Sequence, residues 1–556
     1  MLITRCPSCE SRSFQYEFSK HGFRVVECAR CHLLLLNPQP SDAELAEIYG
    51  ADYYLGEPTA AGRELFSRMK SATARLYLAD LKRYAPRAGL RLLEVGCGTG
   101  EFLLEARNSG FQVTGVEYNQ TAVDAARQLL GPGATVHCGT LADAPLEPGS
   151  FDVCVLSDVI EHMRSPAAFL AELKVVLSPH ATLLMTTPSL DSWSAKFLGS
   201  NWMEFKPEHL FYFDSATSQN LLLACGFEDV IVKANTKVLT ADYIARHFDR
   251  FPVPGVSPIV TSLTGLLPKS LANREFQFVA SGISVFSRVA AERTSTRLSV
   301  VVPAFNESAT VAALLDGLLA KRIDGVDIDV IVVESNSTDG TRDIVKQYAG
   351  RDNIQLLFQD KPRGKGNAVR AGLAVATGDY ILIQDADLEY DLEDYDALLL
   401  PLIERQAAFV LGARHGGKTW KMRQFENQWL TSKFMNIGHW FFTFLVNLFF
   451  GLRLKDPFTM FKVFRRDCLY GLQFKCNRFD FDFELLIKLV KKGYRPIEVP
   501  VNYRSRSFAQ GKKVSVLRDP ISWLWAILRL RLEPVDPFAE IDRRHRLEAA
   551  EPARAD

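Results

Sequence analysis

The feature that most constrains this chain is a glycine-rich turn between an apolar run and a helical pattern. Residues 91–95 read Arg-Leu-Leu-Glu-Val, residues 96–100 read Gly-Cys-Gly-Thr-Gly, and residues 101–108 have the apolar spacing of a helix. A buried strand that enters a helix through glycines opens a doubly wound α/β domain, because glycines let the backbone approach a ligand closely. The pattern therefore predicts a Rossmann-like cofactor site near residue 96.

The length of the chain requires further domains. At 556 residues it exceeds what one hydrophobic core supports, and its 47% hydrophobic and 23% charged residues are typical of folded proteins. Lys plus Arg and Asp plus Glu each total 65, which disfavours general nucleic-acid binding. The N-terminus lacks an apolar signal core, so we expect a cytoplasmic protein, or one at the inner face of a membrane.

Four cysteines near the N-terminus predict a structural zinc ribbon over residues 1–40. Cys-x-x-Cys pairs stand on either side of two short predicted strands, residues 14–18 and 23–27. Four thiolates fill a tetrahedral shell and leave no position for a reactive water, so the metal should hold up the fold. The predicted zinc ligands are Cys6, Cys9, Cys28 and Cys31.

A second acid sharpens the cofactor prediction. The next strand, residues 111–116, ends in Glu117, about 20 residues after the first glycine, where an acid suits ribose hydroxyls. The ribose belongs either to a dinucleotide or to S-adenosylmethionine. A dinucleotide fingerprint would place Gly or Ala at position 101, where the chain has Glu101.

The whole pattern resembles class I S-adenosylmethionine-dependent methyltransferases. Their first motif, acid-x-Gly-x-Gly-x-Gly, matches residues 94–100, and the resemblance continues at residues 149–153, 157–162 and 182–188. It implies a methyltransferase domain over residues 41–235, with residues 236–296 as a helical extension and linker. The implied cofactor-binding residues are Glu94, Gly96, Gly98, Gly100 and Glu117, with Asp143 as a candidate for the adenine.

Methyl transfer from a sulfonium donor depends mainly on positioning, and it needs a base only when the acceptor must lose a proton. His162 and His209 are the candidate bases, and a packing role is the alternative for each. A zinc ribbon ahead of such a domain is similar to the arrangement in some deoxysugar C-methyltransferases. That similarity points to a sugar or glycan acceptor.

The C-terminal half carries a second nucleotide site. Two apolar strands, residues 298–302 and 329–333, end in polar clusters, and a basic glycine-rich segment, residues 361–372, precedes another strand, residues 380–384. That strand delivers Asp385-Ala-Asp387. Two carboxylates spaced in this way share a hard cation, which neutralises a diphosphate leaving group.

These motifs resemble GT-A family 2 glycosyltransferases, especially those that transfer a sugar to a polyprenyl phosphate. The matching motifs span residues 297–515, and residues 516–556 read as an amphipathic tail. The resemblance implies Mg or Mn at Asp385 and Asp387, and catalytic roles for Asp387, Asp482 and Glu484. The implied nucleotide-sugar contacts are Pro303, Glu307, Glu334, Lys365, Asp385, Arg506, Lys512 and Lys513.

Several alternatives stay open at this stage. The usual Asp-Asp-Gly-Ser is replaced by residues 334–337, so the donor is UDP- or GDP-linked. A lipid phosphate acceptor needs no strong base, whereas a hydroxyl acceptor needs a carboxylate such as Asp482. Residues 437–452 fit either a peripheral membrane contact or a buried helix, being too interrupted to span a bilayer. The chain is either bifunctional or a single glycosyltransferase with a degenerate methyltransferase-like scaffold.

Overall fold

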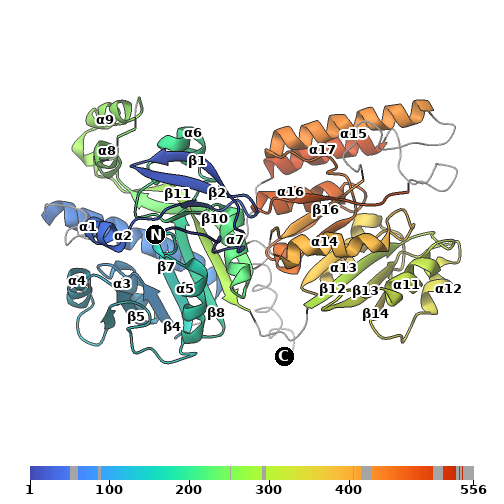
Figure 1. Cartoon of the computed structure of the whole chain (residues 1–556), viewed down its shortest axis with the longest axis horizontal. Helices are drawn as coiled ribbons and strands as arrows, with labels where there is room; N and C mark the ends of the chain where they lie inside the picture. The colour runs from blue at the N-terminus through green and yellow to red at the C-terminus, as the bar shows by residue number, and fades with distance from the viewer. Residues whose placement is uncertain are drawn as a thin grey trace, which may run out of the picture. The chain divides into compact units, whose positions relative to one another are not determined.

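The chain folds into two compact units, Met1–Ala291 with Ile541–Asp556, and Glu292–Glu540 (Figure 1). The structure, a computed structural model, describes residues 1–49, 60–85, 89–250, 252–253, 255–290, 296–404, 406–414, 429–504, 518–533, 538 and 541.

The first unit is built on an α/β sheet. Its strands, in spatial order, are β10 (Phe227–Leu239), β11 (Phe276–Val289), β8 (Leu177–Pro188), β7 (Phe151–Ser157), β4 (Arg91–Val95), β5 (Gln112–Glu117) and β6 (Thr135–Cys138). The strands from β8 to β6 are parallel, and β11 lies antiparallel between β10 and β8. The central strands are almost wholly buried, as apolar runs in a parallel sheet should be. This order confirms the predicted Rossmann-like fold.

Helices that follow the strands begin at recognisable signals. Asn119 caps α4 by accepting a hydrogen bond from the Ala122 N–H, and Pro166 stands in the first turn of α5. Asp214 forms a capping box with Thr217 at the start of α7. The helices of this unit are α1 (Asp42–Ile48), α2 (Ala60–Tyr84), α3 (Glu101–Asn108), α4 (Gln120–Leu130), η1 (Ile160–His162), α5 (Pro166–Val176), α6 (Trp193–Leu198), η2 (Gly199–Asn201), α7 (Ser215–Ala224), α8 (Ala241–Arg250), α9 (Ser257–Gly265) and α10 (Lys269–Ala272).

The cysteine-bearing segment forms a small antiparallel sheet with a strand from much later in the chain. Its order is β1 (Phe14–Lys20), β2 (Phe23–Cys28), β3 (Leu34–Leu36) and β9 (Phe211–Tyr212). In β3, Leu34 pairs with Tyr212 and Leu35 with Phe211. The four cysteines belong to the same hydrophobic core as the large sheet. The ribbon is therefore built into the first unit instead of standing apart from it.

Residues 236–296 are predicted to be a helical extension and linker, but they also contain a strand of the large sheet. They contain α8 to α10, but they also contain β11, which pairs with Pro188 to Thr182 of β8 on one side and with β10 on the other. The alternation in β11 is weak, with residues such as Ser284 and Ser287 buried in the sheet. Hydrophobic periodicity alone could not find a strand of this kind.

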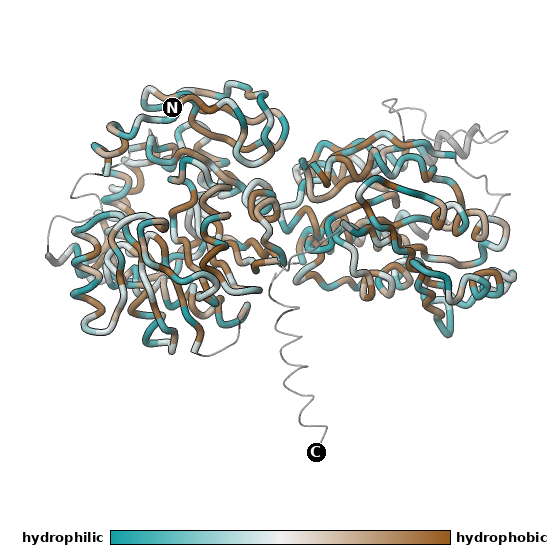
Figure 2. The backbone as a smooth tube through the Cα atoms, turned by 60° about the horizontal axis from the view of Figure 1, so that its bottom comes forward, coloured by the Kyte–Doolittle hydropathy of each residue, from teal (hydrophilic) through white to brown (hydrophobic). Residues whose placement is uncertain are grey.

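The second unit contains a mixed sheet. Its strands, in spatial order, are β14 (Ile354–Phe358), β13 (Val326–Glu334), β12 (Thr296–Ala304), β15 (Tyr380–Ile383), β17 (Lys462–Arg465), β16 (Phe409–Ala413) and β18 (Ile497–Pro500). The first four are parallel to one another, β17 is antiparallel to both of its neighbours, and β16 runs parallel to β18. Figure 2 shows the hydrophobic residues concentrated along the interior strands of each unit.

Helices pack on both faces of this second sheet. They are α11 (Val311–Ala320), α12 (Thr341–Lys346), α13 (Lys365–Val375), η3 (Leu392–Asp394), α14 (Tyr395–Ile403), α15 (Trp429–Phe450), η4 (Arg466–Leu469), α16 (Phe481–Lys491) and α17 (Arg518–Leu532). The C-terminal segment, read as a tail, contains α17, whose Ile527 and Leu530 share a core with Phe442 and Val446 of α15.

Candidate functional site

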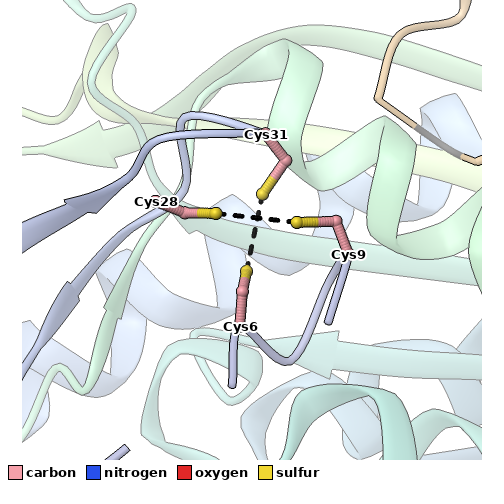
Figure 3. A group of neighbouring side chains, drawn as sticks. All are labelled: Cys6, Cys9, Cys28 and Cys31. Atoms are coloured by element: carbon pink, nitrogen blue, oxygen red, sulfur yellow. Dashed lines mark hydrogen bonds between the residues drawn. The ribbon is translucent and has the colours of Figure 1, made fainter. Parts of the chain in front are cut away.

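The four N-terminal cysteines converge as a metal centre requires (Figure 3). The sulfurs of Cys6 and Cys31 are 3.5 Å apart, and those of Cys9 and Cys28 are 3.6 Å apart. Sulfurs around one tetrahedral zinc ion with 2.3 Å bonds lie about 3.8 Å from each other. All four side chains are buried. The residues fit a closed, structural zinc site.

The cofactor loop of the first unit is held by Glu117 at the end of β5. One oxygen of Glu117 accepts a hydrogen bond from the Gly98 N–H at 2.9 Å, and the other accepts from the Asn119 N–H at 2.9 Å. The glycines are required by packing as well: a Cβ on Gly96 would lie 2.6 Å from Val159 Cγ2, and one on Gly100 would lie 3.1 Å from Ala126 Cβ. The structure thus brings Gly96, Gly98, Gly100 and Glu117 together at the ends of β4 and β5.

Glu94 is the unusual member of this group. Its side chain is 3% exposed, and its Oε2 has no hydrogen-bond partner. Burial, together with the charges of Glu101 and Glu117, raises the pKa of Glu94 well above its ordinary value. A buried carboxylate oxygen without a donor indicates a missing polar ligand group. An ammonium such as the amino group of S-adenosylmethionine would supply it, so the residues fit this cofactor.

Asp143 lies in the turn after β6, close to the same edge of the sheet. Its Oδ2 accepts hydrogen bonds from the Thr140 N–H at 2.9 Å and the Thr140 hydroxyl at 2.6 Å. These bonds hold the pKa of Asp143 below its usual value. Gly139 in the same turn donates its N–H to the Glu117 carbonyl at 2.9 Å. Asp143 therefore shapes the turn beside Glu117, and a contact with adenine stays a proposal.

Beyond the cofactor loop lies a polar cluster that the sequence only partly predicts. Lys237 of β10 donates to Asp158 Oδ2 at 2.8 Å, and the Thr186 hydroxyl donates to Asp158 Oδ1 at 3.2 Å. The charge of Asp158 outweighs burial and raises the pKa of Lys237. Burial raises the pKa of Glu161 to about 8, with a further contribution from Asp158. β10 mixes apolar and polar residues and contains a second lysine, Lys233, so the strand pattern does not single out Lys237.

His162 and His209 face each other in this cluster, with ring centroids 4.9 Å apart. Nδ1 of His162 is 2.9 Å from the Glu208 carbonyl oxygen and 2.7 Å from the Tyr49 hydroxyl. Nδ1 of His209 is 2.8 Å from the Glu204 carbonyl oxygen. Burial lowers the pKa of His162 to about 4 and that of His209 to about 3, so both rings are neutral near pH 7.

The residues predicted to contact the nucleotide lie first at the ends of β12 and β13. Glu334 is fully buried and accepts hydrogen bonds from the Ser337 N–H at 2.7 Å and from Arg342. Although burial opposes it, these donors lower the pKa of Glu334. The Glu307 N–H donates to the Thr341 hydroxyl at 2.8 Å, and Pro303 is the residue of β12 opposite Val333. The polar ends of the two strands are therefore joined by hydrogen bonds.

The two aspartates after β15 have different partners. Lys365 Nζ lies 2.6 Å from Asp385 Oδ1 and 2.8 Å from Oδ2, so an ammonium neutralises the first carboxylate. Although burial opposes it, Asp385 and Asp482 raise the pKa of Lys365. Asp387 Oδ1 accepts a hydrogen bond from the Glu389 N–H at 3.2 Å. Carboxylate oxygens at this edge of the sheet suit Mg²⁺ or Mn²⁺ as ligands. The ammonium of Lys365 supplies the positive charge that such an ion would bring to Asp385.

Asp482 and Glu484 have separate surroundings. Burial raises the pKa of Asp482 to about 6, against the charges of Lys462 and Lys365. Glu484, which is fully buried, instead accepts hydrogen bonds from the Lys475 and Cys476 N–H groups and from Lys488 Nζ at 2.7 Å. This environment favours a structural role for Glu484, because its oxygens are already taken by the loop before α16.

The glycine-rich segment contacts the loop before α16. A Cβ on Gly364 would lie 2.4 Å from the Asn477 carbonyl oxygen, and one on Gly366 would lie 2.6 Å from Phe481 Cβ. Arg370 donates to the Phe474 carbonyl at 2.7 Å. These residues therefore pack against the loop before α16. The predicted phosphate contacts Arg506, Lys512 and Lys513 lie outside the described residues.

Two buried charges near Asp482 escaped the prediction. Lys462 is fully buried, and burial lowers its pKa to about 8. Arg414 forms a bidentate pair with the fully buried Asp456, each bond 2.7 Å long. The position of Lys462 in an apolar strand is the feature of the sequence that could have indicated this residue. The spacing of Arg414 and Asp456 in the sequence does not indicate that they form a pair.

One face of the second unit exposes large apolar side chains on α15 and α17, which we call the apolar surface. On α15 they recur at helical spacing while the opposite face packs in the core. Residues 437–452 are therefore half buried and half exposed. Among the described residues, no helix has the length and apolarity to cross a bilayer. The apolar surface comprises Ile437, Trp440, Phe441, Phe444, Leu448, Leu524, Trp525, Leu528 and Leu532.

A basic cavity adjoins the C-terminal end of α15. It has a volume of about 790 Å³. Its lining includes the basic residues Arg453, Lys455 and Arg495 and the acidic residue Glu498. Glu498 accepts a hydrogen bond from the Asp456 N–H at 2.6 Å. The cavity is thus connected through Asp456 to Arg414.

Comparisons with known proteins agree with the two sites. The family description "Methyltransferase domain" matches residues 64–232, and "Glycosyl transferase family 2" matches residues 299–471. The chain is 31% identical over 217 residues to dolichyl-phosphate beta-glucosyltransferase of Trichomonas vaginalis, which covers 36% of this chain and 62% of the relative. It is 32% identical over 210 residues to dolichyl-phosphate beta-glucosyltransferase of Drosophila melanogaster, covering 34% and 62%. The chain thus spans less than two thirds of each relative.

Solved structures match the first unit weakly. Phosphoethanolamine N-methyltransferase 2 of Haemonchus contortus has a TM-score of 0.27 at 19% identity, covering 39% of this chain and 53% of that one. At this score the likeness adds nothing to the sheet order described above. The two matched families and the two sites establish that the chain carries a methyltransferase domain followed by a family 2 glycosyltransferase domain.

Proposed function

We propose that the chain is a bifunctional enzyme that methylates with its first unit and transfers a sugar from a nucleotide donor to a polyprenyl phosphate with its second. The proposal of sugar transfer to a polyprenyl phosphate rests on one observation. The family 2 domain exposes the apolar surface, and this surface ends at the basic cavity. A polyprenyl phosphate has a long apolar chain and an anionic head, which these two features complement.

The donor end of the second unit is proposed as follows. Pro303, Glu307 and Glu334 line the nucleotide pocket, and Asp385 and Asp387 hold the cation, with Asp387 as the catalytic carboxylate. The cation would neutralise the diphosphate as it leaves. Lys365 must release Asp385 when the cation binds, and its ammonium is then free to contact the diphosphate. Arg506, Lys512 and Lys513 are proposed as further phosphate contacts.

The acceptor decides whether Asp482 acts as a base. A lipid phosphate is already an anion, so Asp482 only orients it together with Lys462 and Arg414. A hydroxyl acceptor would need the ionised Asp482 to remove its proton. The similarity to two dolichyl-phosphate beta-glucosyltransferases favours the phosphate.

In the first unit, Glu94 is proposed to bind the amino group of S-adenosylmethionine and Glu117 its ribose, with Gly96, Gly98 and Gly100 admitting the cofactor. The buried polar cluster beyond the loop supports a polar acceptor, such as a sugar. If that acceptor must lose a proton, His162 or His209 is positioned to take it, because both are neutral near pH 7.

The glycosyl proposal is tested by incubating the full-length protein with radiolabelled UDP- and GDP-sugars, Mg²⁺ or Mn²⁺, and polyprenyl phosphate. Label extracted into organic solvent by the wild type and by Asp352→Ala, but not by Asp387→Ala, supports it. Asp352 is an exposed matched control in the same unit. Protein that binds the donor but labels no lipid contradicts the lipid acceptor.

The methyl half is tested by calorimetric titration with S-adenosylmethionine. We expect binding by the wild type and by Glu172→Ala, which changes an exposed glutamate on α5, and at least about tenfold weaker binding by Glu117→Ala. A wild type that does not bind the cofactor would favour the alternative of a scaffold module beside a single glycosyltransferase.

A further inference from the structure

Glu161, His162 and His209 form a second group of converging ligands. One ligand atom from each residue lies within 4.8 Å of the others. Glu161 and His162 belong to η1, and His209 precedes β9. The Leu210 N–H donates to the Glu161 carbonyl at 2.8 Å, so the two segments are fixed beside each other.

The hydrogen bonds of the two rings decide which nitrogens are available. Nδ1 of His162 and Nδ1 of His209 each lie within 3 Å of a main-chain carbonyl, at 2.9 Å and 2.8 Å. A carbonyl can only accept, so these contacts favour a proton on both Nδ1 atoms, and the Tyr49 hydroxyl, 2.7 Å from Nδ1 of His162, can accept from the same N–H. The Nε2 atoms are left with lone pairs, which is the arrangement of imidazoles that bind metals.

Glu161 supplies independent evidence of a missing ligand. Glu161 is 1% exposed, and one of its oxygens accepts from the Thr187 hydroxyl at 3.1 Å, while the other, Oε1, has no partner. A buried carboxylate oxygen is not left unpaired without cost. We propose that Glu161, His162 and His209 bind one divalent transition-metal ion of the zinc class.

This ligand set differs from the cysteine centre in being open. Two imidazoles and one carboxylate are a ligand set of catalytic zinc sites, which keep a position for water or substrate. Bonds of about 2.0–2.2 Å place tetrahedral ligand atoms about 3.3–3.6 Å from each other, and the three atoms already lie within 4.8 Å of one another. Two sulfur pairs of the cysteine centre, by contrast, are already within about 0.3 Å of the spacing around zinc.

The proposed ion lies beside the methyl-donor loop. Val159, one residue before η1, is the side chain that a Cβ on Gly96 would meet at 2.6 Å. With the ion bound, His162 and His209 hold it and no longer act as bases, and the open position would instead hold an acceptor oxygen near the donor and lower the pKa of an acceptor hydroxyl. This last role rests on the proposed methyl transfer, whereas binding of the ion does not.

The test counts metal on the full-length protein by mass spectrometry after equilibration with Zn²⁺ and removal of unbound metal. Without a nucleotide sugar Lys365 occupies Asp385, so we expect two ions per wild-type chain and one in His209→Gln or Glu161→Gln. His247→Gln changes another partly buried imidazole in the unit and should keep two. Loss of one of three ligands should weaken the second ion by at least about 100-fold.

Cobalt substitution separates the two centres. Cobalt at the cysteines gives thiolate charge-transfer absorption, and cobalt at the second site adds bands without it, which His209→Gln and Glu161→Gln should remove. A wild type with only the thiolate spectrum and one ion would overturn the proposal. Because neither donor nor acceptor is present, this failure differs from a failure to bind S-adenosylmethionine, which is titrated on the same variants.

Discussion

The two sheets place carboxylates at the ends of their central strands, yet these carboxylates have different partners. In the first unit, Glu117 accepts backbone N–H groups and Glu94 retains an unpaired oxygen. In the second, Asp385 is ion-paired with Lys365. The first site is thus arranged for its ligand in advance, whereas the second must exchange an internal cation for an external one. The predictions below test this contrast.

The largest effect is expected from Asp387→Ala. Loss of a cation ligand should reduce glycosyl transfer by about 1,000-fold, because the diphosphate leaves without charge compensation. Binding of S-adenosylmethionine should be unchanged, since Asp387 lies in the other unit. Both quantities are measured on one preparation. An equal loss of methyl-donor binding would break the assumed independence of the sites.

Next in size is Cys28→Ser, or removal of zinc with a chelator. The cysteine centre supports the sheet in which Leu35 pairs with Phe211, directly after the loop that carries His209. Its loss should destabilise the first unit by several kcal/mol and abolish methyl transfer.

Calorimetric unfolding measures this loss, and binding of the nucleotide sugar serves as the reference for the second unit. Cys225→Ser, outside the metal centre, is the matched variant and should keep the wild-type profile. Unaltered methyl transfer without metal would show that the ribbon does not position the acceptor loop.

A smaller effect is expected from Lys365→Met. Losing the ammonium should let the cation bind more tightly in the absence of donor, yet lower kcat/KM for the nucleotide sugar by about 100-fold, since a phosphate contact disappears. Titration with Mn²⁺ and steady-state kinetics report the two effects separately. Lys361→Met, exposed in the same segment, is the control. Weakened cation binding would instead mean that Lys365 supports the site and does not compete for it.

The apolar surface should contribute about tenfold to membrane affinity. Trp440 and Phe444 are 58% and 51% exposed, and replacing both by Ser removes two large side chains from a bilayer interface. Sedimentation with vesicles that contain polyprenyl phosphate measures the change. Phe197→Ser, which alters an exposed aromatic residue of the first unit, should bind like the wild type. Equal binding by the double variant would remove this surface from the proposal.

The smallest effect concerns pH. Burial raises the pKa of Asp482 to about 6, so a base role predicts that glycosyl transfer falls about tenfold per unit below pH 6. The folded state then holds its proton where the unfolded state has lost it, and stability decreases as the pH rises from about 4 to 6. Asp482→Asn should remove both dependences. A flat rate profile with the wild type favours the phosphate acceptor.

Local patterns were enough to predict much of both sites. The glycine turn at residues 96–100, the cysteine pairs and the Asp385-x-Asp387 motif each lie within a few residues, so their geometry follows from one strand end and one turn. The packing of Glu484 and of Gly364 could not be predicted in this way. Both face a loop that reaches them through the tertiary fold, and a local motif contains no information about that loop.

The sequence by itself determined the two α/β domains, their order and the residue types at each strand end, because these depend on hydrophobic runs and turn residues close together in the chain. Only the tertiary structure decided that β9 joins the ribbon, that Lys365 pairs with Asp385, and that Glu161 meets two imidazoles. These contacts join segments far apart in the sequence, and which of them form depends on packing of the whole core.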